Sequence, residues 1–394
     1  MPGQFRHLVT SFAEDRENQV AFVTKRGDRA LPNVTRAIYE PPRGAASQTH
    51  AYLRQFEDAV LHGQAAARAC LALKNQGFSP DIVIAHPGWG ESLFVREIFP
   101  STAILNYGEF YYLPAGADVN FDPAQPADLD RVCALRARNA HLLLALEAAD
   151  RTVCPTHWQK SVHPSAFHPR ISVVFDGIDT GTVKPDPTAS FVLPNGRALR
   201  PADEVVTYVS RGLEPARGFP TLMRALPRLC ALRPKAQVVI AGSDEPAYGG
   251  AAPDGGSWRE AMLAEAPVDP DRVHFVGLVP YTDYLRLLQV SSAHVYLTTP
   301  FVMSWSAIEA LAAGCVVVAS RTAPVEEFVE HGENGLLFDF FSPEELAETV
   351  SSVLADRKAC EPLRIAARAR IVQDHALAVC LPRQRSLIAE LTAR

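Results

Sequence analysis

Short apolar segments alternate with amphipathic helical segments along almost the whole chain, and this alternation limits the folds open to it. The apolar segments are rich in Val, Ile and Ala, as at 81–85 (DIVIA), 102–106 (TAILN) and 315–319 (CVVVA). The segments at 48–76 and 129–149 are rich in Ala, Leu and Arg, and both are long enough for helices. Continuous apolar strands between such helices indicate parallel sheets covered on both faces. The sequence therefore predicts an α/β, doubly wound fold.

The alternation is interrupted once, over residues 180–203, where the chain is rich in proline. This composition is typical of a linker, and a second α/β pattern begins after it. A length of 394 residues also fits two domains. We therefore expect an N-terminal domain at 1–182, a linker at 183–203 and a C-terminal domain at 204–378. A terminal helix at 379–394 is expected to pack back toward the N-terminal domain.

The start of the chain departs from the usual doubly wound pattern, which opens on a buried strand. Here Pro2-Gly3-Gln4 leads directly into an expected helix at 5–12. We expect that the first strand of the N-terminal domain is missing because the start is placed too late. The alternative is a sheet that begins one element later.

Charge and cysteine content exclude several classes of protein. Lys plus Arg is 38 and Asp plus Glu is 44, a net charge of −6, which argues against nonspecific nucleic-acid binding. The seven cysteines are scattered without a CxxC pair, so a disulfide framework or zinc ribbon is not expected. No apolar run approaches the ~20 residues that span a bilayer. We expect a cytoplasmic protein, and leave open a peripheral contact with the cytoplasmic face of the inner membrane.

The segment 209–224 (VSRGLEPARGFPTLMR) joins an expected strand to an expected helix. Such a loop lies at the carboxyl edge of a parallel sheet, where ligands bind in open α/β folds. Arg211 and Arg217 offer guanidinium groups to phosphate oxygens, and the neighbouring glycines let the backbone approach an anion. The N-terminus of the helix adds oriented N–H groups. The alternative is a solvated loop with two surface arginines.

A second candidate segment is 298–320 (TTPFVMSWSAIEALAAGCVVVAS). Ser304 or Ser306 could cap the N-terminus of a helix, and the turn that they form with Trp305 would offer N–H groups to a diphosphate. Glu309 lies in that helix, where its carboxylate could accept two hydrogen bonds from a ribose diol. The alternative is a glutamate that faces solvent.

Two loops of the N-terminal half follow expected strands and carry polar and aromatic side chains. His86, Trp89 and Glu91 follow strand 81–85, and Tyr107 and Glu109 follow strand 102–106. Aromatic rings on such loops could stack on a sugar, and Glu109 is the best ionisable candidate. The alternative is that these loops are structural turns.

Together these segments resemble the donor half of the family 4 retaining glycosyltransferases, also called glycosyl transferases group 1. The resemblance rests on Arg211 and Arg217, six residues apart, and on Glu309 with the run EALAAG that it begins. Supporting runs are DGID at 176–179, FVG at 275–277 and ENGLL at 333–337. The resemblance covers residues 150–375 well and the N-terminal half loosely, where Gly3 resembles the glycine of the loop after the family's first strand.

The chain departs from the family pattern at one position. The family has a further glutamate eight residues before the position of Glu309, near the donor sugar, and this chain has Phe301 there. Phenylalanine cannot accept a sugar hydroxyl or carry a charge, so a mechanism that uses a carboxylate at this position is in doubt. Some members resemble this chain in their Pro-Phe-x-x-Ser-Trp-Ser run, so the departure does not prove inactivity.

The resemblance implies a GT-B fold, in which two Rossmann-like domains face across a cleft. It implies transfer, with retention, from a UDP-, GDP- or ADP-sugar to a glycan or lipid-linked acceptor in polysaccharide or glycolipid biosynthesis. No metal or cofactor is implied, and we interpret Asp269-Pro270-Asp271 as a turn. The alternatives are a nucleotide-sugar-binding protein without transfer activity and a GT-B epimerase or phosphorylase.

The resemblance also implies roles for individual residues. Arg211 and Arg217 would stabilise the diphosphate leaving group, and with Glu109 they form the expected catalytic set. The expected donor site contains Arg211, Arg217, Gly277, Phe301, Ser304, Trp305, Ser306 and Glu309. The expected acceptor site contains Gly3, His86, Trp89, Glu91, Tyr107 and Glu109.

Overall fold

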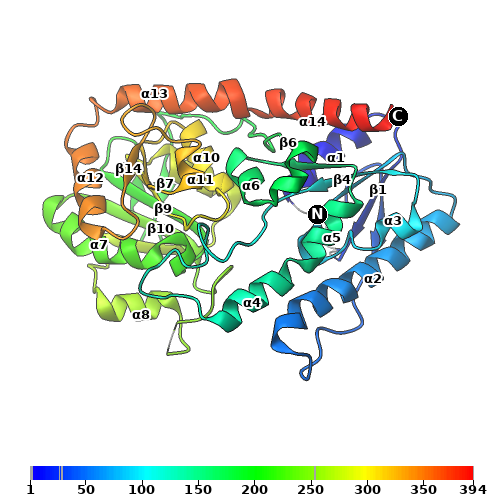
Figure 1. The fold of residues 1–394 in the computed structure, drawn as a ribbon. Helices are drawn as coiled ribbons and strands as arrows, with labels where there is room; N and C mark the ends of the chain where they lie inside the picture. Colours follow the sequence, from blue (N-terminus) through cyan, green and yellow to red (C-terminus); the bar gives the residue numbers. More distant parts are fainter. Residues whose placement is uncertain (1–2, 26, 28–29, 253, 394) are drawn as a thin grey trace. The chain divides into compact units, whose positions relative to one another are not determined.

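The computed structural model describes residues 3–25, 27, 30–252 and 254–393. The chain forms two compact units, each an α/β fold (Figure 1). Unit 1 contains the residues up to Gly177 together with those from Ala378 onward, and unit 2 contains Ile178–Leu377. Within the described residues, none of the helices combines the length and apolar character needed to cross a membrane.

Unit 1 is built around a four-stranded parallel sheet in the order β3-β4-β5-β6. The strands are β3 (Ile82–Ala85), β4 (Ala103–Tyr107), β5 (Arg151–Cys154) and β6 (Ile171–Val173). A separate parallel pair, β1 (Val20–Thr24) and β2 (Val34–Ile38), precedes them in the chain. The described residues begin with a 3₁₀ turn, η1 (Gly3–Phe5). Pro2, which belongs to the first loop expected from the sequence, lies outside the described residues.

The α-helices of unit 1 are α1 (Arg6–Ala13), α2 (Arg54–Asn75), α3 (Val95–Ile98), α4 (Leu129–Arg138), α5 (Ala140–Ala148), α6 (His157–Val162) and α14 (Leu377–Thr392). The single helix expected at 129–149 is therefore two. Asn139 separates them, and its side chain bonds both backbone groups of Tyr112: Oδ1 accepts the N–H at 3.1 Å and Nδ2 donates to the carbonyl at 2.7 Å. The break fixes the loop that follows β4.

The two ends of the chain share one core in unit 1. Phe5 and Leu8 from the first elements pack with Leu387, Ile388 and Leu391 of α14 over strands β4 and β5. Figure 1 shows α14 beside α1. The structure thus places the terminal helix in unit 1, where its apolar face covers the sheet.

Unit 2 contains a six-stranded parallel sheet in the order β11-β10-β9-β12-β13-β14. Counted from β9, this order is 3-2-1-4-5-6, that of a doubly wound fold, and it reverses between β9 and β12. The strands are β9 (Val205–Gly212), β10 (Gln237–Ser243), β11 (Val273–Gly277), β12 (Ala293–Tyr296), β13 (Val317–Ser320) and β14 (Leu336–Phe338).

Helices cover both faces of this sheet, so its central strands carry apolar side chains on each side. The helices are α7 (Phe219–Leu232), α8 (Trp258–Glu265), α9 (Tyr281–Gln289), α10 (Trp305–Ala312), α11 (Ala323–Glu326), α12 (Pro343–Ala355) and α13 (Glu361–Arg370). Helix α12 packs against α7, whereas α10 packs against α13. All side chains of β12 and β13 are buried.

In place of the expected linker, residues 183–203 belong to unit 2. They include an antiparallel hairpin of β7 (Phe191–Val192) and β8 (Ala198–Leu199). Phe191, Leu193 and Leu199 are buried in one cluster with Val205 and Leu287. The prolines mark turns, but these apolar side chains hold the segment against the unit because burying them removes apolar surface from water.

Candidate active site

Three loops meet at the carboxyl edge of the unit 2 sheet, where the strand order reverses. They follow β9, β10 and β12, which are neighbours in the sheet. Open α/β sheets bind ligands at such a reversal, outside the carboxyl ends of the strands. The loops after β9 and β12 carry most of the donor residues expected from the sequence.

Arg217 is the central charged group of this edge. Its side chain is only 5% exposed, and Nη1 donates to Thr298 Oγ1 at 2.7 Å, to Val302 O at 3.1 Å and to Tyr296 OH at 3.2 Å. A guanidinium remains charged in proteins, and burying a charge is costly. The hydrogen bonds to these three partners offset that cost. The expected companion, Arg211, lies near the end of β9 and is exposed, so the two arginines occupy different environments.

Gly218 allows the β9 loop to approach β12. Its φ is +64°, and a Cβ added to it would lie 2.4 Å from the Cβ of Leu297. Only glycine fits a left-handed backbone with so little room. Helix α7 begins at the next residue, so the close approach sets where that helix starts.

Helix α10 begins beside Arg217. Ser304 caps it, accepting the N–H of Ser306 at 3.3 Å, and the two hydroxyls lie 2.9 Å apart. The N–H of Ser304 donates to Tyr296 OH at 2.8 Å, so one tyrosine hydroxyl contacts both Arg217 and the start of α10. Trp305, the first residue of the helix, is partly exposed.

Two tyrosines of α9 orient Glu309. Tyr281 OH donates to its Oε1 and Tyr284 OH to its Oε2, each at 2.7 Å. Burial and the charge of Glu309 raise the pKa of Tyr284 well above its ordinary value, so this phenol remains a donor. Each carboxylate oxygen can accept a further hydrogen bond. Gly277 ends strand β11 with a φ of +65° and open space around it.

The sequence did not point to Tyr248 and Glu214, which complete this edge. The Tyr248 ring lies over the Arg217 guanidinium, 5.1 Å from Cζ to the ring centroid, and 5.6 Å from the centroid of Phe301. Glu214 is fully buried and accepts the N–H groups of Ala247, Tyr248 and Gly249. A glycine-rich loop after a strand next to β9 was the available indication.

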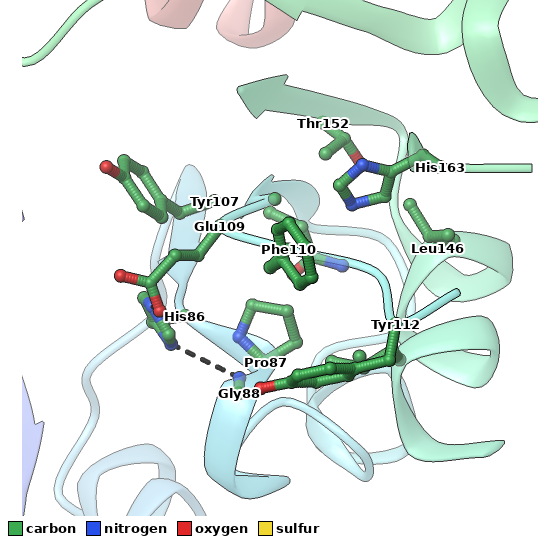
Figure 2. Close-up of a pocket in the computed structure, with 13 residues that line it drawn as sticks. His86, Pro87, Gly88, Tyr107, Glu109, Phe110, Tyr112, Leu146, Thr152 and His163 are labelled. Atoms are coloured by element: carbon green, nitrogen blue, oxygen red, sulfur yellow. Dashed lines mark hydrogen bonds and ion pairs between the residues drawn. The ribbon is translucent and has the colours of Figure 1, made fainter. Parts of the chain in front are cut away.

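Unit 1 has a pocket at the corresponding edge of its own sheet (Figure 2). It is lined by the loops that follow β3 and β4, with side chains from α5 and His163. Figure 2 shows the His86 side chain beside that of Glu109, with the Phe110 ring above Pro87 and the Tyr112 ring below it in this view. Of the expected acceptor residues, His86, Tyr107 and Glu109 line this pocket.

His86 and Glu109 form a hydrogen-bonded pair. His86 Nδ1 accepts the N–H of Gly88 at 3.2 Å, so in neutral His86 the proton lies on Nε2, which is 3.3 Å from Glu109 Oε2. The ring stacks on Tyr107 at 5.5 Å between centroids. Burial lowers the pKa of His86, but the hydrogen bond and charge of Glu109, together with the charges of Glu91 and Asp176, outweigh it, so the pKa is raised overall.

Side chains from distant segments hold Glu109 in place. Gln4 Nε2 donates to its Oε1 at 3.3 Å, and Gln159 Nε2 donates to its backbone carbonyl at 2.6 Å. His163 Nδ1 lies 2.6 Å from Gln159 O, and burial lowers the pKa of His163 to about 4. A neutral His163 that donates from Nδ1 presents Nε2 as an acceptor. Gln159 had only a weak functional indication in the sequence, Gln4 stood out only as part of the first loop, and nothing pointed to His163.

The other expected acceptor residues lie outside the pocket lining. Trp89 in η3 (Pro87–Trp89) is exposed. Glu91 accepts a hydrogen bond from Tyr39 OH at 2.8 Å. Gly3 opens η1, next to Gln4. The structure therefore brings together only part of the expected set.

Among the described residues, no group of three or more His, Cys, Asp or Glu side chains could hold a metal ion. The sequence Asp269-Pro270-Asp271 forms a turn before β11, in which Asp269 Oδ1 accepts the N–H of Asp271 at 2.9 Å.

The two α/β units and their parallel sheets define a GT-B fold, and comparison with known proteins identifies the family. Residues 16–183 match the family model described as "Glycosyl transferase family 4 group". Residues 194–370 match the one described as "Glycosyl transferases group 1". The chain therefore belongs to the group 1, family 4, glycosyltransferases.

Individual relatives are more distant. The chain is 30% identical over 229 residues to a GDP-mannose-dependent alpha-(1-6)-phosphatidylinositol monomannoside mannosyltransferase of Mycobacterium tuberculosis, covering 54% of each chain. It is 30% identical over 220 residues to a D-inositol 3-phosphate glycosyltransferase of Rhodococcus jostii, covering 54% of this chain and 45% of that protein. The matches thus span about half the length of these curated relatives.

A solved structure resembles the chain over nearly its whole length. The crystal structure of Anabaena HepE in complex with UDP-glucose aligns with a TM-score of 0.66 at 15% identity, covering 98% of this chain and 96% of that one. At this identity the likeness supports the fold alone.

Proposed function

We propose that this chain transfers a sugar from a nucleotide-diphosphate sugar to a hydroxyl of a glycan or lipid-linked acceptor, with retention and without a metal. The observation that carries the proposal is the position of Arg217, a buried cation beside the start of α10 at the strand-order reversal of unit 2. The name of the mycobacterial relative, a phosphatidylinositol monomannoside mannosyltransferase, supports a glycolipid acceptor, which would place the reaction at a cytoplasmic membrane face.

In this proposal unit 2 binds the donor. The diphosphate meets Arg217, the exposed Arg211 and the N–H groups at the start of α10, which together supply positive charge and donors. The carboxylate of Glu309, oriented by its two tyrosines, accepts the ribose hydroxyls. The open backbone at Gly277 leaves room for the base.

The chemical step follows from where charge develops. The bond between the anomeric carbon and the diphosphate oxygen breaks, and negative charge grows on the diphosphate. Arg211 and Arg217 stabilise that charge more strongly in the transition state than in the bound donor, which lowers the barrier. The acceptor oxygen bonds to the anomeric carbon on the face that the diphosphate leaves, and its proton passes to a diphosphate oxygen.

Unit 1 binds the acceptor in the pocket that contains His86 and Glu109. The Glu109 carboxylate accepts a hydrogen bond from an acceptor hydroxyl and so orients it. His86, held by Gly88 on one side, keeps that carboxylate in place through Nε2. In this role Glu109 orients the hydroxyl, and the proton leaves with the diphosphate.

One observation favours a second candidate, a nucleotide-sugar-binding protein without transfer activity. Phe301 packs against Tyr248 at the donor edge, where it offers neither a hydrogen bond nor a charge. Such a protein would bind a nucleotide sugar tightly and release no nucleotide, whereas a transferase would release it.

Thermal unfolding with UDP, GDP, ADP and their common sugar conjugates tests the proposal. A ligand at ~100 times its dissociation constant stabilises by about 2.7 kcal/mol, which raises the melting temperature by a few degrees. We expect a shift with one base only, followed by nucleotide release when acceptor is added. No shift with any of these ligands would contradict the donor site. A shift without nucleotide release against a broad set of acceptors would favour the binding protein.

A further inference from the structure

The segment 244–250, which follows β10, is held by a buried carboxylate. Glu214 is fully buried, and its oxygens accept the N–H groups of three successive residues: Ala247 at 3.2 Å, Tyr248 at 3.0 Å and Gly249 at 2.7 Å. A buried charge is costly unless such hydrogen bonds compensate it, and bonds to a carboxylate are stronger than neutral ones. Glu214 therefore fixes the backbone around Tyr248.

The contact between the two loops is close along their backbones as well. A Cβ added to Gly212 would lie 2.7 Å from Glu245 O and 2.8 Å from Ala247 N. The end of β9 and the segment 244–250 thus touch directly, and neither can shift without the other. The backbone position of Tyr248, and with it the position of the ring, is fixed by these contacts and by Glu214.

One face of the Tyr248 ring is covered by Arg217, and about half of the residue remains exposed to solvent. Its ring lies 5.1 Å from Arg217 Cζ and 5.6 Å from the Phe301 ring at an angle of 62°, yet the residue is 52% exposed. Arg217 is only 5% exposed. A ligand that reaches the cation therefore also contacts the aromatic pair Tyr248–Phe301.

We propose that Tyr248 contacts the sugar of the donor, and that Glu214 is the positioning residue that places it there. This inference rests on the function proposed above. The C–H face of a sugar packs on an aromatic ring, and the Tyr248–Phe301 pair lies at the edge of the site that holds the diphosphate. The pair binds the sugar by stacking, at the position where Phe301 offers no hydrogen bond.

The test compares affinity for the free nucleoside diphosphate with affinity for its sugar conjugate, using the pair selected by the melting experiment. Because Tyr248 also covers Arg217, both affinities can change, but we expect Tyr248→Ala to weaken binding of the conjugate about tenfold more than binding of the free diphosphate, the upper range for one aromatic contact. Tyr248→Phe keeps the ring and loses only the hydroxyl, which hydrogen-bonds Arg217, so any change in affinity should be the same for both ligands. Equal weakening of both ligands by Tyr248→Ala, or no weakening of either, would overturn the sugar contact. A loss of affinity in Tyr248→Phe that is confined to the conjugate would overturn it as well.

Glu214→Gln tests the positioning role. The three N–H groups converge on Glu214 Oε2, and a neutral amide oxygen accepts hydrogen bonds more weakly than a carboxylate oxygen does. In Glu214→Gln the segment therefore loosens, and the loss of affinity for the conjugate should appear in the wild-type background but not in Tyr248→Ala. Glu260→Gln is the control, because Glu260 also accepts a backbone N–H, that of Ser257 at 3.0 Å, at the start of α8. If Glu214→Gln does not fold, Glu214→Asp replaces it. An equal loss in both backgrounds would overturn the positioning role, and a wild type that binds no nucleotide would overturn the proposed function itself.

Discussion

His86 Nε2 lies 3.3 Å from Glu109 Oε2, and through this contact the carboxylate raises the pKa of a histidine whose burial lowers it. Glu109→Gln removes the charge and keeps the shape, so the pKa of His86 should fall below that of the wild type. An NMR titration of the His86 ring measures this change. The same pKa in both proteins would contradict the pairing.

The same substitution should separate acceptor from donor. Because Glu109 is assigned to orienting the acceptor hydroxyl, Glu109→Gln should lower kcat/KM for the acceptor by about 10², the cost of a misplaced reactant, while donor affinity stays unchanged. Steady-state kinetics with varied acceptor and a separate donor titration check this. Glu91→Gln is the control, because Glu91 follows the neighbouring strand β3 but bonds Tyr39 and does not line the pocket. A comparable loss in that variant would argue against a specific role for Glu109.

Arg217 and Arg211 should differ in what their removal does. Arg217→Ala should lower kcat by about 10²–10³, as expected for loss of a charge that stabilises the leaving group. It should also destabilise by about 1–3 kcal/mol, since Tyr296, Thr298 and Val302 lose a buried partner. Arg211→Ala should lower the rate without a change in stability, because that side chain is exposed. Turnover and denaturant unfolding measure both, and unchanged turnover in Arg217→Ala would contradict the assignment.

Gly218 and Gly277 form a matched pair for a backbone test. Their φ angles are +64° and +65°, but a Cβ at Gly218 would meet Leu297 at 2.4 Å whereas one at Gly277 meets no atom within 4 Å. Gly277→Ala should cost about 1 kcal/mol, the penalty of the left-handed conformation alone. Gly218→Ala adds overpacking and should cost about 1–3 kcal/mol more. Equal costs in urea unfolding would show that the β9 loop relaxes freely.

Acid should destabilise unit 2 through His294. This residue is fully buried on β12, its Nδ1 lies 2.9 Å from Thr207 Oγ1, and burial lowers its pKa to about 4. In the unfolded chain this histidine has a pKa near 6.5, so it becomes protonated as the pH falls below about 6.5, whereas in the folded chain it stays neutral down to about pH 4. Acid therefore favours the unfolded chain over this range. Between pH 7 and pH 5 this linkage removes about 2 kcal/mol.

His294→Gln should therefore make stability less dependent on pH, even though it lowers stability at pH 7. Denaturant unfolding at pH 7 and pH 5 measures the difference, with His157→Gln at an exposed position as the control. The same loss between the two pH values in wild type and His294→Gln would show that other groups dominate the acid response.

Most strands of the two larger sheets could be located from the sequence because apolar residues predominate in them. The strand expected at 102–106 is β4 (Ala103–Tyr107), and that at 315–319 corresponds to β13 (Val317–Ser320). Strand β2 (Val34–Ile38) escaped the same reasoning because it carries exposed positions and no apolar run. The break at Asn139 depends on a tertiary hydrogen bond to Tyr112, which helix propensity does not reveal.

Only the part of the site that follows from the order of strands and loops along the chain could be predicted. Parallel strands bring the residues that follow them to one edge, which gives a general location for Arg217 and Glu309. Their partners come from other elements: Tyr248, beside Arg217, from the loop after β10, and Tyr281, beside Glu309, from helix α9. Those pairings depend on how the loops pack, so a linear pattern does not contain them.

The shared core of α1 and α14 has a consequence for synthesis of the chain. Phe5 and Leu8 leave the ribosome well before the residues that cover them, Leu387, Ile388 and Leu391. Unit 2 is one continuous segment and can fold as soon as it has emerged from the ribosome, whereas unit 1 can complete its core only after α14 has emerged. During translation the order of maturation is thus reversed, and the domain made first is the one that a nascent-chain chaperone has longest to protect.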